Sequence, residues 1–133
     1  MSQPSNTAPL PPAISCAALA ATLQTAAGDA RPLILDVRRA PAFDAAAHTI
    51  DGALRIAPDA LAAAIPHLPR GRPVIACCVH GHEVSQSAAR ALIDAGFDAQ
   101  FLEGGITAWS EAGLAVMPKP VPWQSPHGRP PAA

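Results

Sequence analysis

Apolar residues occur along this chain in short continuous runs and in longer segments where they recur with helical periodicity. The short runs are bounded by proline, glycine or charged residues, which is typical of strands buried on both faces. They predict strands at residues 33–37, 74–78 and 99–102, with a weaker one at 53–56. The periodic segments predict helices at residues 16–27, 41–47, 59–65 and 85–95, and a last helix anchored by Ile106 and Trp109 that stops at Gly113. Alternating strands and helices predict a mostly parallel sheet with helices on both faces.

Capping residues and prolines set the ends of the first predicted helices. Ser15 is a good N-cap for the first helix, and Gly28 suits its end. Pro41 is expected to open the second helix, which then places Phe43 on the core side.

Proline is concentrated at both ends of the chain, where ten of the sixteen prolines lie before residue 13 or after residue 117. Such segments are typical of extended or disordered tails. We therefore expect an N-terminal tail at residues 1–12, one folded domain at 13–116 and a proline-rich C-terminal tail at 117–133.

The composition bounds the possible functions. Half of the residues are hydrophobic, which is enough for a core. A formal net charge of −1 with 14% charged residues gives no long-range field to attract nucleic acid or an anionic membrane surface. No apolar stretch has the length of a membrane span, and the first twelve residues lack the charged start and apolar centre of a secretion signal. We expect neither nucleic acid nor membrane as a partner.

Three cysteines, Cys16 and the adjacent pair Cys77 and Cys78, do not form a disulfide framework, because a bond between neighbours is strained. Reduced thiols favour a cytoplasmic location. The sequence contains no nucleotide-binding loop and no sign of an organic cofactor, so no cofactor is expected.

Cys78 is the most informative residue, because it ends the apolar run at 74–78 and precedes a polar loop. A helix expected to open near Ser85 would present unpaired backbone N–H groups to the thiol, and these stabilise negative charge on sulfur. Ligands of parallel sheets also bind beyond the carboxyl ends of the strands. The pattern therefore predicts a nucleophilic cysteine.

His80 and His82 lie close to the two adjacent cysteines and raise the alternative of a metal site. The spacing Cys-Cys-x-His-x-His does not aim four ligands at one point. We therefore expect no metal.

Several motifs together resemble those of the rhodanese-like domain family. They are Leu35-Asp36-Val37-Arg38, His48, Ile50-Asp51-Gly52-Ala53, the run from Val74 to Cys78 with its loop, and Leu102-Glu103-Gly104-Gly105-Ile106-Thr107-Ala108-Trp109. The likeness spans residues 14–116. It implies an α/β rhodanese-like three-layer fold, with a central, mostly parallel five-stranded sheet and helices on both faces.

The resemblance implies a sulfurtransferase. Its cysteine takes a sulfane sulfur from thiosulfate or from a low-molecular-weight or protein persulfide, and passes it to a thiol or cyanide-like acceptor. Cys78 matches the catalytic position, and Cys77 matches a buried residue before it. The active-site loop, whose amides would cradle the sulfur, is matched by Val79, His80, Gly81, His82, Glu83, Val84 and Ser85.

Each polar loop residue also has a plainer interpretation. His80 and His82 are either donors to a bound anion or ordinary loop residues. Glu83 is either a base or a solvated charge, and we favour the second because a carboxylate opposes ionisation of a nearby thiol. Ser85 is expected to be a helix N-cap and a possible donor to the persulfide.

Four residues outside the loop are expected to support the site structurally. Asp36 and Arg38 resemble a family pair that braces the loop region, and they most simply form an ion pair. Gly104 and Gly105 are expected to shape a tight turn near the active face.

The loop departs from the usual family pattern. The family often has an Arg just before the Ser or Thr that ends the loop, and this chain has Glu83 and Val84 before Ser85. The spacing to Gly96 also suggests a loop that is longer by one residue. The missing Arg favours a bulkier or less charged donor than thiosulfate, which is a dianion.

Two other functions remain open at this stage. One is a catalytically weak regulatory or interaction domain whose proline-rich tails bind partners, which the missing Arg and Glu83 favour. The other is a phosphatase or arsenate-reductase-type enzyme, because the longer loop resembles the active-site loop of those enzymes. Their sites, however, need a cation that this loop lacks. The sequence makes no prediction about oligomeric state.

Overall fold

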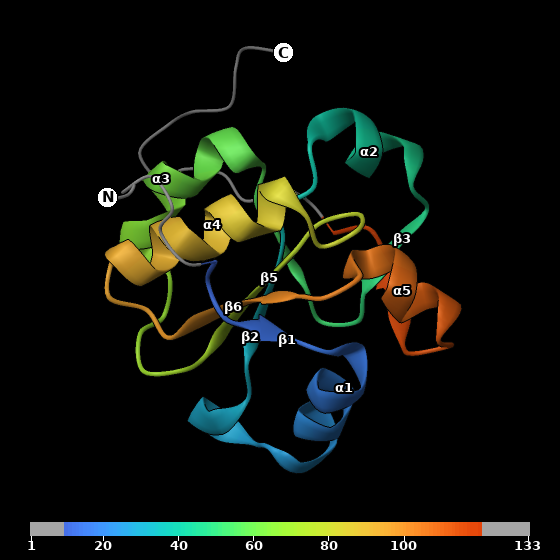
Figure 1. Cartoon of the computed structure of the whole chain (residues 1–133), viewed down its shortest axis with the longest axis horizontal. Coiled ribbons are helices and arrows are strands. Elements are labelled where there is room, and N and C mark those ends of the chain that lie inside the picture. The colour runs from blue at the N-terminus through green and yellow to red at the C-terminus, as the bar shows by residue number, and fades with distance from the viewer. Residues whose placement is uncertain (1–9, 121–133) are drawn as a thin grey trace, which may run out of the picture.

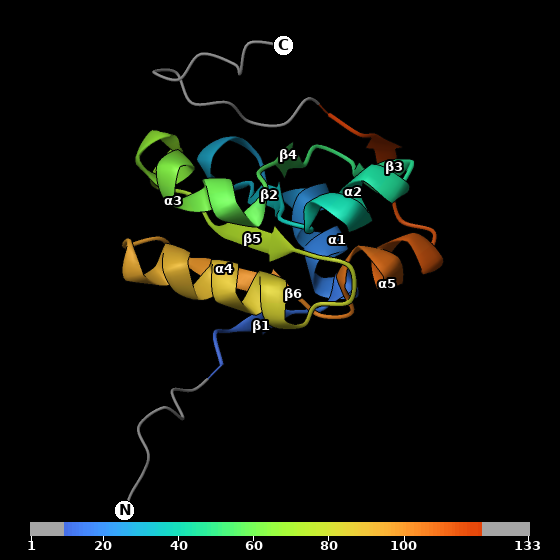
Figure 2. The same ribbon diagram turned by 90° about the horizontal axis from the view of Figure 1, so that it is seen from above.

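The computed structural model describes residues 10–120 and places a five-stranded, fully parallel sheet at their centre. Figure 2 shows its strands in order from bottom to top: β1 (Ala13–Ile14), β6 (Ala99–Leu102), β5 (Val74–Cys77), β2 (Leu33–Asp36) and β4 (Leu54–Arg55). β5 is central, with β2 and β6 as parallel neighbours. A strand in that position is shielded on both edges, which suits its uninterrupted apolar sequence.

A second, two-stranded sheet lies apart from the first. Strand β3 (His48–Ile50) pairs antiparallel with β7 (Val116–Pro118), so that the last part of the described segment returns to its first half. Figure 2 shows β3 near α2 and α5, beyond the arrowhead of β5.

Helices cover both faces of the central sheet (Figure 1). The α-helices are α1 (Cys16–Thr25), α2 (Ala40–Ala45), α3 (Leu61–Ala64), α4 (Glu83–Asp94) and α5 (Gly105–Glu111), and the short 3-10 helices are η1 (Gly28–Ala30), η2 (Pro58–Ala60) and η3 (Ile65–His67). α3 and α4 cover one face and α1 the other, where α5 shares its buried cluster. No helix within residues 10–120 is long and apolar enough to cross a membrane.

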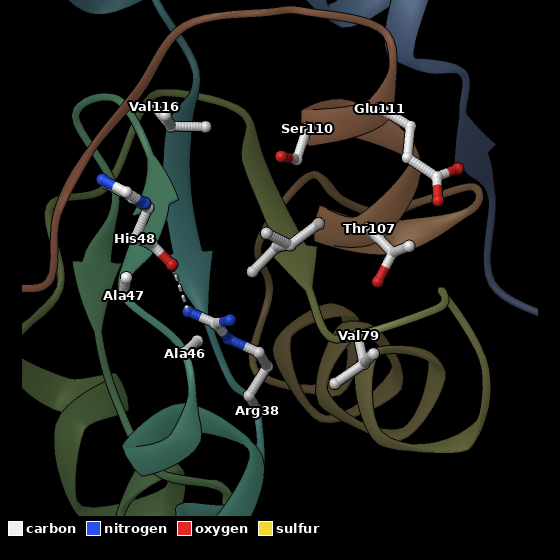
Figure 3. Close-up of a pocket in the computed structure, with 10 residues that line it drawn as sticks. Arg38, Ala46, Ala47, His48, Val79, Thr107, Ser110, Glu111 and Val116 are labelled. Carbon is white, nitrogen blue, oxygen red and sulfur yellow. Dashed lines mark hydrogen bonds between the residues drawn. The ribbon is translucent and has the colours of Figure 1, made fainter.

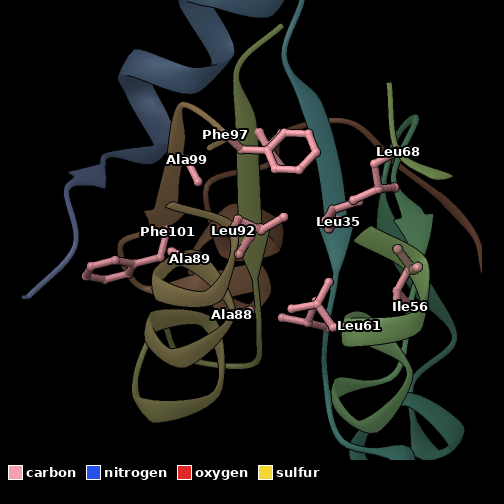
Figure 4. Close-up of a cluster of buried hydrophobic side chains, with 14 residues drawn as sticks. Leu35, Ile56, Leu61, Leu68, Ala88, Ala89, Leu92, Phe97, Ala99 and Phe101 are labelled. Atoms are coloured by element: carbon pink, nitrogen blue, oxygen red, sulfur yellow. The ribbon is translucent and has the colours of Figure 1, made fainter. Parts of the chain in front are cut away.

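The alternation of side chains along β5 divides the core into two clusters. Val74 and Ala76 face the cluster under α3 and α4, which includes Leu92 (Figure 4). Ile75 and Cys77 face the cluster that α1 and α5 cover. Because successive strand residues point to opposite faces, the residue after Cys77 turns toward the α4 side.

The predicted fold class is confirmed, and most of the differences fall in the shortest elements. β1, β3 and β7 were not predicted, because two or three residues are too few to reveal an alternating pattern. The helix predicted at residues 59–65 is a chain of η2, α3 and η3 instead. Pro66 lacks the N–H group that a regular helix would use at that position, which accounts for the change from α3 to η3.

Regular structure continues past residue 116, where the sequence predicted the start of a tail. Met117 and Pro118 belong to β7, and Lys119 Nζ donates hydrogen bonds to the carbonyl oxygens of Phe43 (2.8 Å) and Asp44 (3.1 Å). These contacts attach the first part of the proline-rich segment to α2. The remainder of the two predicted tails, residues 1–9 and 121–133, lies outside the described residues.

Leu92→Ala is expected to lower the free energy of unfolding by about 2–5 kcal/mol, because it opens a cavity between α4 and the sheet. The matched control is Leu10→Ala, whose side chain is 68% exposed, and there the change is expected to stay within about 0.5 kcal/mol. Urea unfolding of both variants measures the difference. Equal losses would contradict the placement of α4 on the core.

Candidate active site

Cys78 follows the last residue of β5 and is only 5% exposed. Its Sγ donates a hydrogen bond to the hydroxyl oxygen of Ser85 at 3.1 Å, and Ser85 is completely buried. The thiol therefore lies between the carboxyl end of the central strand and the first turn of α4. Ligands of parallel sheets bind at this end of the sheet, beyond the carboxyl ends of the strands.

Ser85 is not the N-cap that the sequence predicted. α4 begins at Glu83 with His82 as its N-cap, so Ser85 lies within the first turn and its hydroxyl donates to the carbonyl oxygen of His82 at 3.3 Å. The helix starts early because Gly81, with a φ of +76°, turns the loop sharply. Glu83 is exposed, which agrees with its interpretation as a solvated charge. It is the first residue of α4, where the positive end of the helix dipole favours a carboxylate.

Backbone hydrogen bonds hold the loop after Cys78 against the start of α5. The amide of Ile106 donates to the carbonyl of Cys78 at 2.8 Å, and the amide of Thr107 donates to the carbonyl of Val79 at 3.0 Å. Gly105 has a φ of +66°, and a Cβ on it would collide with both of these carbonyls. Gly104 and Gly105 both have positive φ, and they form the tight turn that packs against this loop.

Four carbonyls of the loop accept hydrogen bonds from the neighbouring helices α5 and α4. Those of Cys78 and Val79 accept from α5, that of Gly81 accepts from the Gln86 side chain at 3.2 Å, and that of His82 accepts from the Gln86 amide at 3.1 Å. In a trans peptide the N–H group points opposite to the carbonyl of the same unit. The amides of residues 79 and 80 therefore point away from α5, and those of residues 82 and 83 point away from Gln86.

A pocket of about 280 Å³ opens beside Cys78. The predicted loop residues divide into two groups around it: five line the pocket, whereas Gly81 packs against the turn at Gly104 and Ser85 lies beneath the sulfur. The imidazole rings of His80 and His82 lie 6.1 Å apart at this pocket. Its lining is Arg38, Arg39, Ala42, Cys78, Val79, His80, His82, Glu83 and Val84.

Asp36 and Arg38 form the expected structural ion pair. Arg38 Nε and Nη2 donate to the two carboxylate oxygens of Asp36 at 3.0 and 2.7 Å, and both residues are buried. The hydroxyl of Thr49 donates to the same carboxylate at 2.8 Å, and Arg38 Nη2 also donates to the carbonyl of His48 at 3.0 Å (Figure 3). The pair thus connects the end of β2 to β3.

A second arginine joins this cluster beside an aromatic ring. Arg55 Nη1 donates to the carbonyls of Asp36 and Arg38, and its guanidinium lies 4.1 Å from the centre of the Phe43 ring. Burial lowers the pKa of Arg55, although the nearby Asp36 opposes that change. Lys119 Nζ lies 4.8 Å from the same ring centre, so Phe43 fixes α2 between cationic groups.

A second cavity of about 360 Å³ adjoins the Cys78 pocket, because Arg38 and Val79 line both. Figure 3 shows Thr107 and Ser110 of α5 on one side of it and Ala46, Ala47 and His48 on the other. Glu111 and Val116 complete its labelled rim.

The other two cysteines differ from Cys78 in environment. Cys77 is fully buried, and burial raises the pKa of its thiol well above the ordinary value, with a further rise from the charge of Asp36. Burial also raises the pKa of the partly exposed Cys16, as does the charge of Glu103. Within residues 10–120 no three His, Cys, Asp or Glu side chains are placed to hold a metal ion.

Sequence reasoning missed Arg39, which lines the pocket beside Cys78. The search for a cation was confined to the loop, whereas Arg39 follows β2 and precedes α2. The available signal was its position just after a predicted strand, since parallel neighbours end at the same edge of a sheet.

Gly105→Ala is expected to lower the free energy of unfolding by about 2 kcal/mol more than Gly113→Ala. Both glycines have positive φ, but a Cβ at Gly113 meets nothing within 4 Å, so the difference isolates the collision with the loop carbonyls. Chemical denaturation of both variants measures it. Equal losses would show that the contact between the loop and α5 is not close.

Cys77 is expected to stay unmodified when the native protein is treated with iodoacetamide near neutral pH. A raised pKa leaves little reactive thiolate, and burial blocks access. Peptide mapping after labelling, repeated in urea, measures the protection. Rapid labelling of Cys77 in the native state would contradict its buried position.

Known proteins resemble this chain in sequence and structure. The family model of the rhodanese-like domain matches residues 19–112. Thiosulfate sulfurtransferase GlpE of Shewanella oneidensis is 39% identical over 80 residues, which are 59% of this chain and 76% of that protein. A full-length protein from Lactobacillus plantarum has a TM-score of 0.69 and 27% identity, over 80% of this chain and 87% of that one. A rhodanese-related protein from Thermoplasma volcanium has a TM-score of 0.66 and 25% identity, over 80% and 97%. As its sequence motifs predicted, the chain belongs to the rhodanese-like domain family.

Proposed function

We propose that this protein is a sulfurtransferase in which Cys78 carries the transferred sulfur as a persulfide. The observation that carries the proposal is the position of the Cys78 thiol, at the end of β5, beside a pocket and 3.1 Å from the Ser85 hydroxyl in the first turn of α4. Cys77 is enclosed by the core and Cys16 lies outside this pocket. The name of the GlpE relative, a thiosulfate sulfurtransferase, supports the same reaction class.

The reaction consists of two displacements at sulfur. In the first, the Cys78 thiolate attacks the outer sulfur of the donor, a new S–S bond forms, and the donor's own bond to that sulfur breaks with its electron pair leaving on the donor remnant. In the second, a thiolate or cyanide attacks the outer sulfur of the persulfide, and the Cys78 thiolate is released. No electrons are gained or lost overall, so no redox cofactor is required.

The loop is proposed to stabilise the anionic sulfur through its backbone. Its amides at residues 79 and 80 are turned away from α5, and those at residues 82 and 83 are turned away from Gln86 of α4. α4, with twelve residues, adds the positive end of its dipole. The Ser85 hydroxyl accepts from the Cys78 thiol and donates to the His82 carbonyl. Once the thiol ionises, rotation of this hydroxyl gives the thiolate a donor without moving the backbone.

The pocket beside Cys78 is proposed to admit both the donor and the acceptor. His80 and His82 at its rim are additional hydrogen-bond donors for an anionic group. The partners are then a small-molecule or protein sulfur donor and a thiol or cyanide-like acceptor. Reduced cysteines favour a cytoplasmic setting.

Exposure of the protein to thiosulfate, or separately to a small-molecule persulfide, is expected to add about 32 Da, which a reductant removes. Intact-mass analysis measures the gain. Cys78→Ser is expected to abolish it, whereas the control Cys16→Ser, which removes a different thiol, is expected to retain it.

A Cys78→Ser protein that still gains sulfur would refute the assignment of the nucleophile. A wild-type protein that gains sulfur from neither donor would instead favour the regulatory or interaction domain.

A further inference from the structure

The pocket beside Cys78 contains a cationic side chain that is not part of the active-site loop. Arg39 lines this pocket together with Cys78, and it also lines the neighbouring cavity between α3 and α4. It is exposed, and the structure assigns its guanidinium no hydrogen bond or ion pair among residues 10–120. Its five N–H donors are therefore available to a ligand.

The guanidinium of Arg38, the other arginine of the pocket, is already hydrogen-bonded to other groups of the protein. It binds both carboxylate oxygens of Asp36. It also donates to the carbonyl of His48, as Figure 3 shows. Its charge is balanced by a buried carboxylate, and most of its donors are in use. Recognition of an anion by Arg38 would require breaking that pair, which is strongly unfavourable in a buried position.

The loop itself supplies no permanent positive charge. Residues 79–84 contain no Lys or Arg, and they contribute the carboxylate of Glu83. Within residues 10–120 the structure describes no ion pair between Glu83 and Arg39, although both line the pocket. Arg39 is therefore the arginine of this pocket whose charge is not already balanced by a buried partner.

The backbone of Arg39 is held in a fixed place relative to Cys78. Its carbonyl accepts from the amide of Phe43 at 2.9 Å, and the Phe43 ring is held by Arg55 and Lys119. The preceding strand, β2, is paired with β5 in parallel, with Asp36 opposite Cys77. Both functional side chains thus start from neighbouring strand ends.

We propose that Arg39 binds the anionic end of the sulfur donor, so that small donors with a sulfonate-type group, such as thiosulfate, are accepted despite the absence of an arginine in the loop. This inference rests on the proposed sulfurtransferase function and adds the residue that recognises the donor. The planar guanidinium matches two oxygens of such a group through paired hydrogen bonds.

The same contact assists the chemical step. The Cys78 thiolate attacks the outer sulfur of thiosulfate, the S–S bond of thiosulfate breaks, and sulfite departs with that electron pair. The total charge of three negative units is conserved, with one on the new persulfide and two on sulfite. Arg39 remains bound to the oxygens while charge accumulates on the leaving group.

The test compares two donors that differ in one charged oxygen. Thiosulfate is a dianion, and methanethiosulfonate has a methyl group in place of one oxygen and a single negative charge. Arg39→Gln is expected to lower kcat/KM for thiosulfate roughly tenfold and for methanethiosulfonate roughly threefold or less. The reason is that the Arg39 guanidinium interacts more weakly with the single charge of methanethiosulfonate, so less is lost when it is removed. Arg39→Lys is expected to recover part of the loss.

The matched control is Arg72→Gln, which makes the same change in net charge. Arg72 lies before the amino end of β5, whereas Cys78 follows its carboxyl end, and Arg72 donates to the carbonyl of Gly28. It is expected to leave both donors within about twofold of wild type. Thermal unfolding of each variant verifies that the fold is retained.

Binding of thiosulfate to the Cys78→Ser protein, measured by calorimetry with and without Arg39→Gln, tests the contact without any chemistry. Weaker binding in the double variant supports the proposal even if sulfur transfer itself is not observed, so the two hypotheses fail separately. Unchanged binding, or an equal loss of kcat/KM with both donors, would overturn the role of Arg39.

Discussion

The arrangement of the site depends on two backbone hydrogen bonds, from the amides of Ile106 and Thr107 to the carbonyls of Cys78 and Val79. They fix the direction of the first peptide units after β5, and therefore also the direction in which the loop amides point. Only a glycine at position 105 allows the helix to approach this closely. The chemistry proposed for the sulfur thus rests on main-chain geometry, which substitution of loop side chains would leave largely intact.

A buried electrostatic cluster holds the opposite wall of the pocket. Asp36 accepts from Arg38 and Thr49, and Arg55 bonds to the carbonyls at the end of β2 while it packs on Phe43. A buried pair of this kind contributes more to a defined geometry than to stability, because desolvation offsets much of the attraction. Its role here is to hold β2, β3 and α2 at one edge, and Lys119 extends the same cluster to the C-terminal segment.

The periodicity of the sequence was sufficient for strands β2, β4, β5 and β6 of the central sheet, for its main helices and for the position of Cys78, because a buried parallel strand leaves an unbroken apolar run. It did not reveal the two-residue β1. It was insufficient for β3 and β7, whose pairing comes from tertiary contact between short segments far apart in sequence. The start of α4 was misplaced because Ser85 has the composition of an N-cap, while its hydroxyl is used by Cys78 and His82. Arg39 was missed because it reaches the pocket only through the pairing of β2 with β5, which places the ends of these two strands side by side.

The parallel pairing of the sheet also determines when the thiol acquires its environment. Asp36, Cys78 and Gly105 belong to three segments joined by long crossovers, and parallel strands gain their hydrogen bonds only after those connections have closed. A nascent or partly folded chain therefore carries Cys78 as an ordinary solvated thiol. Burial of the sulfur and its hydrogen bond to Ser85 arise together with the global folding transition, so that the folding equilibrium sets the fraction of molecules in which the proposed site is assembled.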